Sequence, residues 1–212
     1  MKNFLAIDTS NDYLTVLAAK DGRFALSHLP DCAMRHSVTL MGEVDKVLKE
    51  LSLKAEECDF FAASVGAGSF TGIRIGIAAA KGFCAATGKP SLPVTSFEIA
   101  AYNGIDGGEK TLCLIDALHD AYYACGFDRE KKVIFPPAYL EKEEVLALQR
   151  EGYALRTLSR SLDLPKCTLV DPVEGLKNAV LAKAEKGEFA ELIALYARKS
   201  SAEINLGRGG QV

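Results

Sequence analysis

A glycine-rich turn between two apolar runs constrains the fold of this chain more than any other stretch. Residues 66–76 read GAGSFTGIRIG, follow the apolar run DFFAASV at 59–65, and open a second apolar run at 73–86. This order predicts a buried strand, a tight turn and a helix. Loops that bind phosphate through N–H groups at a helix start have the same order. The stretch is neither a GxGxxG fingerprint nor a P-loop, because no Lys-Ser or Lys-Thr pair closes it.

Two interpretations of the turn therefore stay open. It could be an ordinary connection between a strand and a helix, or it could cradle a phosphate. A first predicted strand at 4–7 ends in Asp8, which could hold a magnesium-phosphate unit or form an Asx turn that leads into a hairpin. The phosphate interpretation gives these candidate residues: Asp8, Thr9, Ser10, Gly66, Gly68 and Ser69.

The helix predicted at 71–87 has no polar side. Small residues recur at every fourth position and share one face: Gly68, Gly72, Gly76 and Ala80. Because glycine inside a helix costs about 1 kcal/mol relative to alanine, this face indicates close approach of another backbone, which the chain's own sheet could supply. The other faces carry only two charges, Arg74 and Lys81. A helix that is apolar all round must be buried on more than one side, so we expect a second helix or a partner protein there.

The order of elements predicts an α/β fold. Up to residue 102 the predicted elements are strands 4–7, 14–19 and 24–29, helix 36–51, strand 59–65, helix 71–87, strand 92–94 and helix 97–102. A hairpin signal, Asp21-Gly22, joins the second and third strands. This order fits a mixed sheet with right-handed crossovers and resembles one half of the actin-like ATPase (ASKHA) fold of sugar kinases, heat-shock ATPases and actin. Two such halves face each other across a nucleotide cleft.

The second half repeats the pattern faintly. Its predicted elements are strands 111–115, 121–127 and 133–135, helix 143–150, strand 168–170, and helices 174–186 and 188–197, while 152–166 is weakly patterned. Asp116 ends its first strand as Asp8 does in the first half, which supports a duplication. The turn-forming stretch NGIDGGEK at 103–110 marks the boundary. We therefore predict subdomains at 1–103 and 111–206, each with a mixed sheet flanked by helices, and a disordered tail at 207–212.

Composition excludes several classes of function. A net charge of −3 without a basic stripe argues against an independent nucleic-acid binder. The six cysteines form no CxxC pair, and none of the three histidines has a partner three or four residues away, so we expect no metal site. Ser69 lacks the GxSxG setting of a hydrolase nucleophile. No signal peptide or charge-free run of about 18 residues is present, so we expect a cytoplasmic protein without a membrane segment.

Five stretches resemble the TsaB (YeaZ) family. Residues 66–76 resemble its GPGSFTGxRxG signature, with Ala67 in place of the usual proline. Leu118 and Ala121 stand where the family's DARxxEVY strand pair has arginine and glutamate. The other similarities are 4–10 to LAIDTS, 36–37 with the helix after them to HSxxLxP, 115–123 to DARxxEVY, and 196–203 to YxRxxxAE.

The resemblance implies a non-catalytic, actin-like paralogue of TsaD, the catalytic subunit that transfers threonylcarbamoyl to adenosine 37 of tRNA. It implies no catalytic residue and no cofactor in the isolated chain, with ATP or ADP only at the interface of the complex. TsaD would be the main partner, a second copy would replace it when the chain is alone, the ATPase TsaE would join the complex, and tRNA would bind only through the complex.

In the family, the two helices of the first half form the dimer interface. Transferred to this chain, the interface is expected to contain Val38, Met41, Leu48, Gly72, Ile73, Gly76, Ile77, Ala80 and Cys84. On this expectation, Gly76→Leu should give a folded monomer. Two other functions stay open beside the scaffold: a stand-alone actin-like ATPase or phosphotransferase that uses Asp8 and the 66–72 loop, and a glycoprotease-type peptidase. An ATPase would need a glycine-rich adenosine-binding turn in the second half, and Gly107-Gly108 and Gly209-Gly210 are poorly placed for one.

Overall fold

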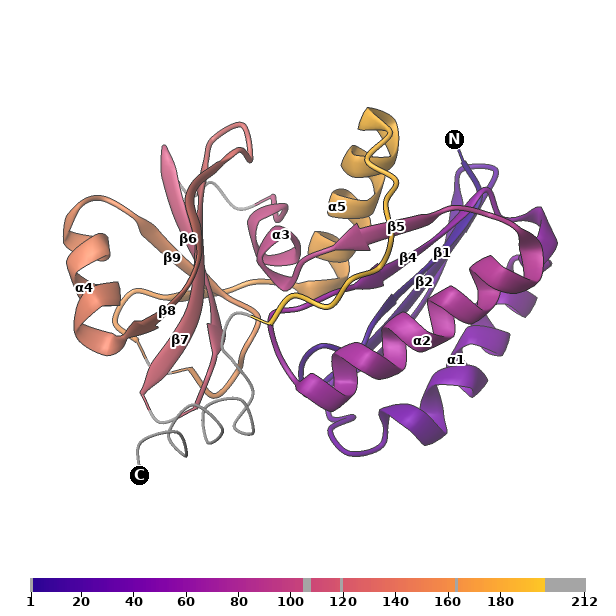
Figure 1. Ribbon diagram of the computed structural model, residues 1–212, viewed down its shortest axis with the longest axis horizontal. Coiled ribbons are helices and arrows are strands. Elements are labelled where there is room, and N and C mark those ends of the chain that lie inside the picture. Colours follow the sequence, from indigo (N-terminus) through magenta and orange to yellow (C-terminus); the bar gives the residue numbers. More distant parts are fainter. Residues whose placement is uncertain (1, 105–107, 119, 163, 197–212) are drawn as a thin grey trace, which may run out of the picture.

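Two five-stranded sheets form the framework of the computed structural model, which describes residues 2–104, 108–118, 120–162 and 164–196 (Figure 1). The first sheet begins with a hairpin, whose turn residues Asp21 and Gly22 both have positive φ, as a two-residue turn between twisted strands requires. Its strands are β1 (Phe4–Asp8), β2 (Leu14–Lys20), β3 (Arg23–Leu29), β4 (Phe60–Ser64) and β5 (Ser91–Val94).

The second sheet repeats the topology of the first. Its strands are β6 (Lys110–Asp116), β7 (Ala121–Asp128), β8 (Val133–Glu141), β9 (Ala154–Thr157) and β10 (Thr168–Leu169). The first sheet has the order β3-β2-β1-β4-β5, and the second, read from β8, has the equivalent order β8-β7-β6-β9-β10. In each, three antiparallel strands are extended by two parallel ones. The expected actin-like α/β fold, with two mixed sheets flanked by helices, is confirmed.

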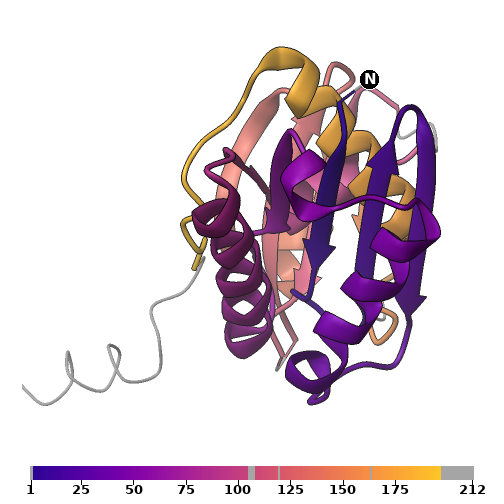
Figure 2. The same ribbon diagram turned by 90° about the vertical axis from the view of Figure 1, so that its right-hand side faces the viewer.

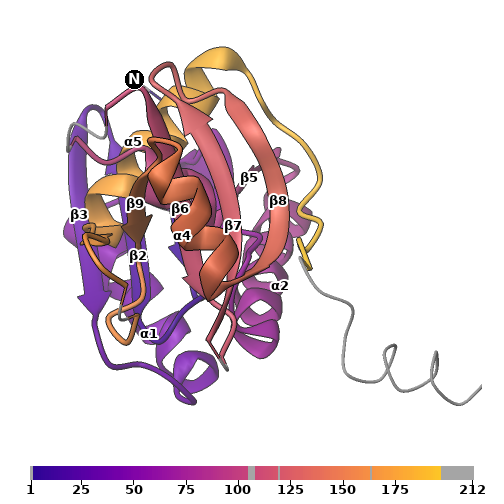
Figure 3. The ribbon, with the colours of Figure 1, turned by 90° about the vertical axis from the view of Figure 1, so that its left-hand side faces the viewer.

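Strand alternation explains how β1 is buried on both sides. Successive side chains of a strand point to opposite faces of the sheet. Leu5 and Ile7 therefore pack with α1 (His36–Glu50) and α2 (Phe70–Thr87), which lie side by side on one face (Figure 2). Phe4 and Ala6 pack on the other face with α3 (Ser96–Ala101) and α5 (Pro172–Lys186), the two helices between the sheets. The outer face of the second sheet is covered by α4 (Lys142–Arg150) (Figure 3), and the short helix η1 (Ala55–Glu57) precedes β4.

The contact between α3 and α5 joins the two halves. Gly175 lies so close to α3 that an added Cβ would come 2.0 Å from the carbonyl oxygen of Ile99, which only glycine permits. Lys183 of α5 donates to Glu98 of α3 at 2.6 Å, with both side chains largely buried. The side chain of Asn103 donates to the carbonyl oxygen of Asp171 and accepts from its N–H. The two halves are therefore held by backbone packing together with buried polar bonds.

The weakly patterned stretch at 152–166 contains β9, which the sequence did not predict. Arg156 interrupts the apolar pattern of this short strand, yet it is only 1% exposed. Its Nη1 donates to the carbonyl oxygen of Ala101 at the last residue of α3. Because the buried Arg156 interrupts the strand, the sequence contains no continuous hydrophobic run that would predict β9.

The helix predicted at 188–197 is wrong over its described part, because residues 188–196 are not helical. They run back from α5 along β5 towards the start of α2 (Figure 1). The N–H of Ala190 donates to the carbonyl oxygen of Ser91 at 3.1 Å, and the N–H of Leu195 donates to that of Val65 at 2.7 Å. Leu192, which is 1% exposed, packs into the first half. The apolar residues whose spacing suggested a helix instead lie on an extended segment that packs along the edge of the first sheet.

The predicted subdomain boundary stays a prediction, although residues 188–196 contact the half that contains β1–β5. The predicted tail at 207–212 and most of the closing YxRxxxAE similarity lie outside the described residues. No helix in the described part of the chain is both long and apolar enough to cross a membrane.

Candidate functional site

The glycine face of α2 rests on the end of β1. An added Cβ at Gly72 would lie 2.0 Å from the carbonyl oxygen of Thr9, and one at Gly76 would lie 2.5 Å from its Oγ1. Oγ1 of Thr9 in turn donates to the carbonyl oxygen of Gly72 at 2.7 Å. Ser69 caps the helix by accepting from the N–H of Gly72. The glycines thus let α2 approach β1 to backbone distance.

Four residues of the interface predicted from the sequence are turned towards the chain itself. Gly72, Ile73, Gly76 and Ala80 are buried, and the two glycines lie against the end of β1, so these four residues offer little surface to a partner. The physical reason is that a helix without a polar side has no sequence signal for which face its own sheet covers. Ile77, Cys84 and Leu48 are half-buried at the edges of the helices. Their role in an interface stays a prediction.

The outward faces of α1 and α2 form an apolar surface with small residues in it. Val38 and Met41 on α1 are 78% and 54% exposed. On α2 the exposed positions include Ala78 and Gly82. An added Cβ at Gly82 would meet nothing within 4 Å, so this glycine serves no contact inside the chain. Gly42, in the interior of α1, is open in the same way.

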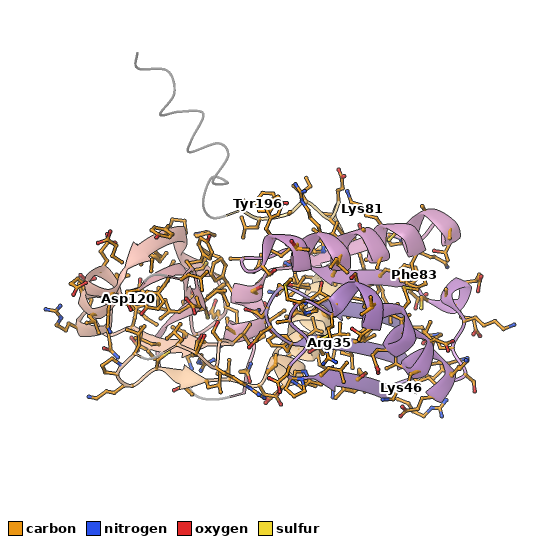
Figure 4. The ribbon with its side chains drawn as sticks, turned by 90° about the horizontal axis from the view of Figure 1, so that it is seen from below. Arg35, Lys46, Lys81, Phe83, Asp120 and Tyr196 are labelled. Carbon is orange, nitrogen blue, oxygen red and sulfur yellow. The ribbon has the colours of Figure 1, made fainter. Side chains whose placement is uncertain are left out.

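We call the following residues the α1–α2 face: Val38, Met41, Gly42, Ile75, Ala78, Gly82 and Ala85. The two helices lie next to each other in Figure 4, with Arg35 and Lys46 marking α1 and Lys81 and Phe83 marking α2. The exposed ion pair of Asp45 and Lys49 continues the same side of α1 beyond these residues, so the apolar part of the face has a charged border, as protein interfaces commonly do.

A cavity of about 950 Å³ lies where the two halves meet. The first half contributes Ser10, Asp12 and the turn that includes Gly68 and Ser69, and the second half contributes Asp116 among others. This is the position at which the actin-like expectation places a nucleotide cleft. Of the phosphate-proximal candidates, Ser10, Gly68 and Ser69 line the cavity. Asp8, Thr9 and Gly66 are buried and do not line it.

Both carboxylate oxygens of Asp8 accept hydrogen bonds from residues of its own chain. Its Oδ1 accepts from the N–H of Ser10 at 2.9 Å and from Ser10 Oγ at 2.6 Å, while its Oδ2 accepts from the hydroxyl of Tyr13 at 2.9 Å. The side chain is fully buried. Burial, followed by the charge of Asp8, raises the pKa of Tyr13 well above its usual value, so the phenol stays a proton donor. Asp8 therefore forms an Asx-type turn with Ser10 and a hydrogen bond with Tyr13. Its carboxylate is not exposed for binding a cation.

The equivalent Asp116 in the second half is also used locally. Its Oδ1 accepts from the N–H of Leu118 at 2.8 Å and its Oδ2 from Ser161 Oγ at 3.1 Å. These bonds place Asp116 in the turn after β6, where it holds its own chain. Among the described residues no group of three or more His, Cys, Asp and Glu side chains is arranged to hold a metal ion.

Sequence reasoning missed Tyr13, although it lies only five residues after Asp8. A tyrosine at the start of a buried strand has the pattern of a core residue, and only the fold reveals that its hydroxyl reaches Asp8. Leu195 and Tyr196, which also line the large cavity, were assigned to a helix. The Tyr196 ring lies 5.0 Å from that of Phe70, and its hydroxyl accepts from Arg74 Nε at 3.1 Å.

Comparisons with known proteins agree with this geometry. The family model described as "tRNA N6-adenosine threonylcarbamoyltransferase" (TsaD) matches residues 29–205. A Bacillus subtilis protein named "tRNA threonylcarbamoyladenosine biosynthesis protein TsaB" is 31% identical over 207 residues, which are 95% of this chain and 90% of that protein. The Haemophilus influenzae protein of the same name is 28% identical over 130 residues, 60% of this chain and only 54% of that protein.

A solved structure from Pseudomonas aeruginosa, described as an uncharacterized protein with similarity to peptidase YEAZ, superposes with a TM-score of 0.78. It is 24% identical, and the match covers 93% of this chain and 100% of that one. A similarity at this level of identity establishes the shared fold alone.

Proposed function

This chain belongs to the TsaB family, and from that premise we propose that it is a non-catalytic scaffold subunit in tRNA threonylcarbamoyladenosine biosynthesis. In this role it pairs with the TsaD catalytic subunit, which transfers threonylcarbamoyl to adenosine 37 of tRNA. The TsaD family model matches most of the chain, which supports a partner of the same fold. Two copies of one fold can pair through equivalent helices, as an isologous dimer does.

The observation that carries the proposal is the α1–α2 face. It exposes Val38 and Met41 to water, and it contains two helix-interior glycines, Gly42 and Gly82, at which an added Cβ would meet nothing within 4 Å. Each such glycine costs about 1 kcal/mol of helix stability relative to alanine. A helix of a partner that packs closely against this face would offset that cost and bury the exposed apolar side chains.

The state of Asp8 supports the non-catalytic part of the proposal. A magnesium ion bound near phosphates needs carboxylate oxygens that are free to coordinate it. Both oxygens of Asp8 instead accept hydrogen bonds from Ser10 and Tyr13, and the side chain does not line the cavity. In the proposed complex, nucleotide binds only where the partner completes the site. TsaE joins that complex, and tRNA contacts it through TsaD.

Complex formation is the first experiment. Purified chain is mixed with TsaD from the same organism and studied by sedimentation velocity. We expect a one-to-one heterodimer, and a homodimer when the chain is alone. Separate sedimentation of the two proteins at concentrations of tens of micromolar would contradict the proposal.

ATP turnover by the isolated chain is the second experiment. Because Asp8 is closed off, we expect phosphate release no faster than the background without protein, and no change in Asp8→Asn. The alternative ATPase predicts steady phosphate release that disappears in Asp8→Asn but persists in an exposed control such as Asp45→Asn. That result would contradict the scaffold proposal and would support the alternative of an ATPase.

A further inference from the structure

A second cavity, of about 290 Å³, lies between β3 and the start of α5. It shares no lining residue with the large cavity and none with α1 or α2. Its polar lining is formed by His28 from the first half and by Arg160 and Asp171 from the second. Its apolar walls include Pro30, Leu158 and Leu169. The volume is at the small end of the range for ligand pockets.

Each of the three polar side chains of this cavity keeps an atom that no described residue bonds, and Arg160 and Asp171 are exposed to water. Nδ1 of His28 lies 2.9 Å from Thr15 Oγ1, and its ring packs against Tyr13, so Nε2 is the nitrogen left for a ligand. Oδ1 of Asp171 caps α5 by accepting from the N–H of Val173, while no described residue bonds Oδ2. The guanidinium of Arg160 forms no hydrogen bond or ion pair with any described residue.

The cavity carries one positive and one negative group. Burial lowers the pKa of His28, while the charge of Asp171 raises it and that of Arg160 lowers it, so the imidazole is neutral at pH 7. Arg160 and Asp171 form no ion pair with each other in the described structure, although the charge of each acts on His28. A ligand that pairs with both carries a carboxylate or similar anion together with a cationic donor.

We propose that this cavity binds a small zwitterion, a free α-amino acid with an apolar side chain. The carboxylate lies against the Arg160 guanidinium, which binds such groups through two parallel N–H donors. The ammonium group lies against Asp171 Oδ2, His28 Nε2 adds a neutral hydrogen bond, and the side chain packs on the apolar walls. Because the walls come from both halves, the ligand would bridge them.

The test uses the full chain and three probes of similar shape. L-leucine carries both charges, 4-methylpentanoate lacks the ammonium group, and 3-methylbutylamine lacks the carboxylate. Binding is measured by ligand-observed NMR and calorimetry at pH 7.5. We expect leucine to bind at least roughly tenfold more tightly than either analogue, because each analogue lacks one of the two charge-assisted contacts that leucine makes.

Two variants assign the charges. Arg160→Gln should weaken leucine binding at least roughly tenfold and remove its advantage over the amine. Asp171→Asn keeps the helix cap, since asparagine caps as well as aspartate, and should remove the advantage over the carboxylic acid. Arg129→Gln, an exposed arginine outside the cavity, serves as the control and should bind leucine as the wild type does.

The proposal is overturned if neither leucine, valine nor phenylalanine saturates the wild-type chain at millimolar concentration. It is equally overturned if leucine binds but Arg160→Gln and Asp171→Asn leave the affinities for all three probes unchanged. Thermal melts of each variant exclude unfolding as the cause of lost binding. The outcome is separate from partner binding, because no residue of this cavity lies on the α1–α2 face.

Discussion

Gly82→Leu is expected to abolish the complex with TsaD while the chain stays folded. Gly82 is exposed on α2, and a Cβ there meets nothing within 4 Å, so leucine fits the isolated chain without strain. Leucine also favours the helix over glycine by somewhat less than about 1 kcal/mol, so the melting temperature should stay the same or rise. A partner helix that approaches to backbone distance, however, would collide with the new side chain.

Sedimentation velocity of the mixture, together with a thermal melt of the variant alone, measures both effects. The matched control is Ala147→Leu, which adds a similar side chain at an exposed position of α4, away from the α1–α2 face. We expect this control to bind TsaD normally. Should Gly82→Leu still sediment as a heterodimer with unchanged affinity, the α1–α2 face is not the interface and the scaffold proposal loses its main support.

Gly72→Ala is expected to destabilise the fold by about 3 kcal/mol or more, a large share of the stability of an ordinary domain. The added methyl group would lie 2.0 Å from the carbonyl oxygen of Thr9, a backbone atom of β1 that cannot move aside. The helix would have to lift off the sheet, and the hydrogen bond from Thr9 Oγ1 to the Gly72 carbonyl oxygen would be lost. Equilibrium unfolding in urea measures the effect as a fall in the midpoint concentration.

The same substitution at an exposed glycine of the same helix is the control. Gly82→Ala adds a methyl group in open space and should stabilise the chain by up to about 1 kcal/mol. Equal midpoints for the two variants would show that α2 does not approach β1 as closely as described. The same contact corrects the expectation for Gly76→Leu. Leucine there would strike the Thr9 side chain, so we now expect an unstable chain and not a folded monomer.

The local elements that the sequence predicted are those whose signals depend on neighbouring residues alone. The Asp21-Gly22 turn requires positive φ at both residues, and it joins β2 to β3 as the sequence predicted. The repeated order of strands and helices then limited the topology to an actin-like one. Gly72 and Gly76 of α2 also predicted close approach of β1 correctly, because a residue with a Cβ would collide there.

Tertiary structure decided which surface each of these features meets. The sequence could not tell that Gly72 faces β1 while Gly82 faces water, since α2 is apolar on every side. The sequence also could not show that the Tyr13 hydroxyl donates to Asp8. Nor could it show that the buried Arg156 belongs to a strand, or that Leu192 lies on an extended segment. Each of these depends on a contact between residues far apart in the chain or on packing against another element, and periodicity within one segment carries no information about the partner across the contact.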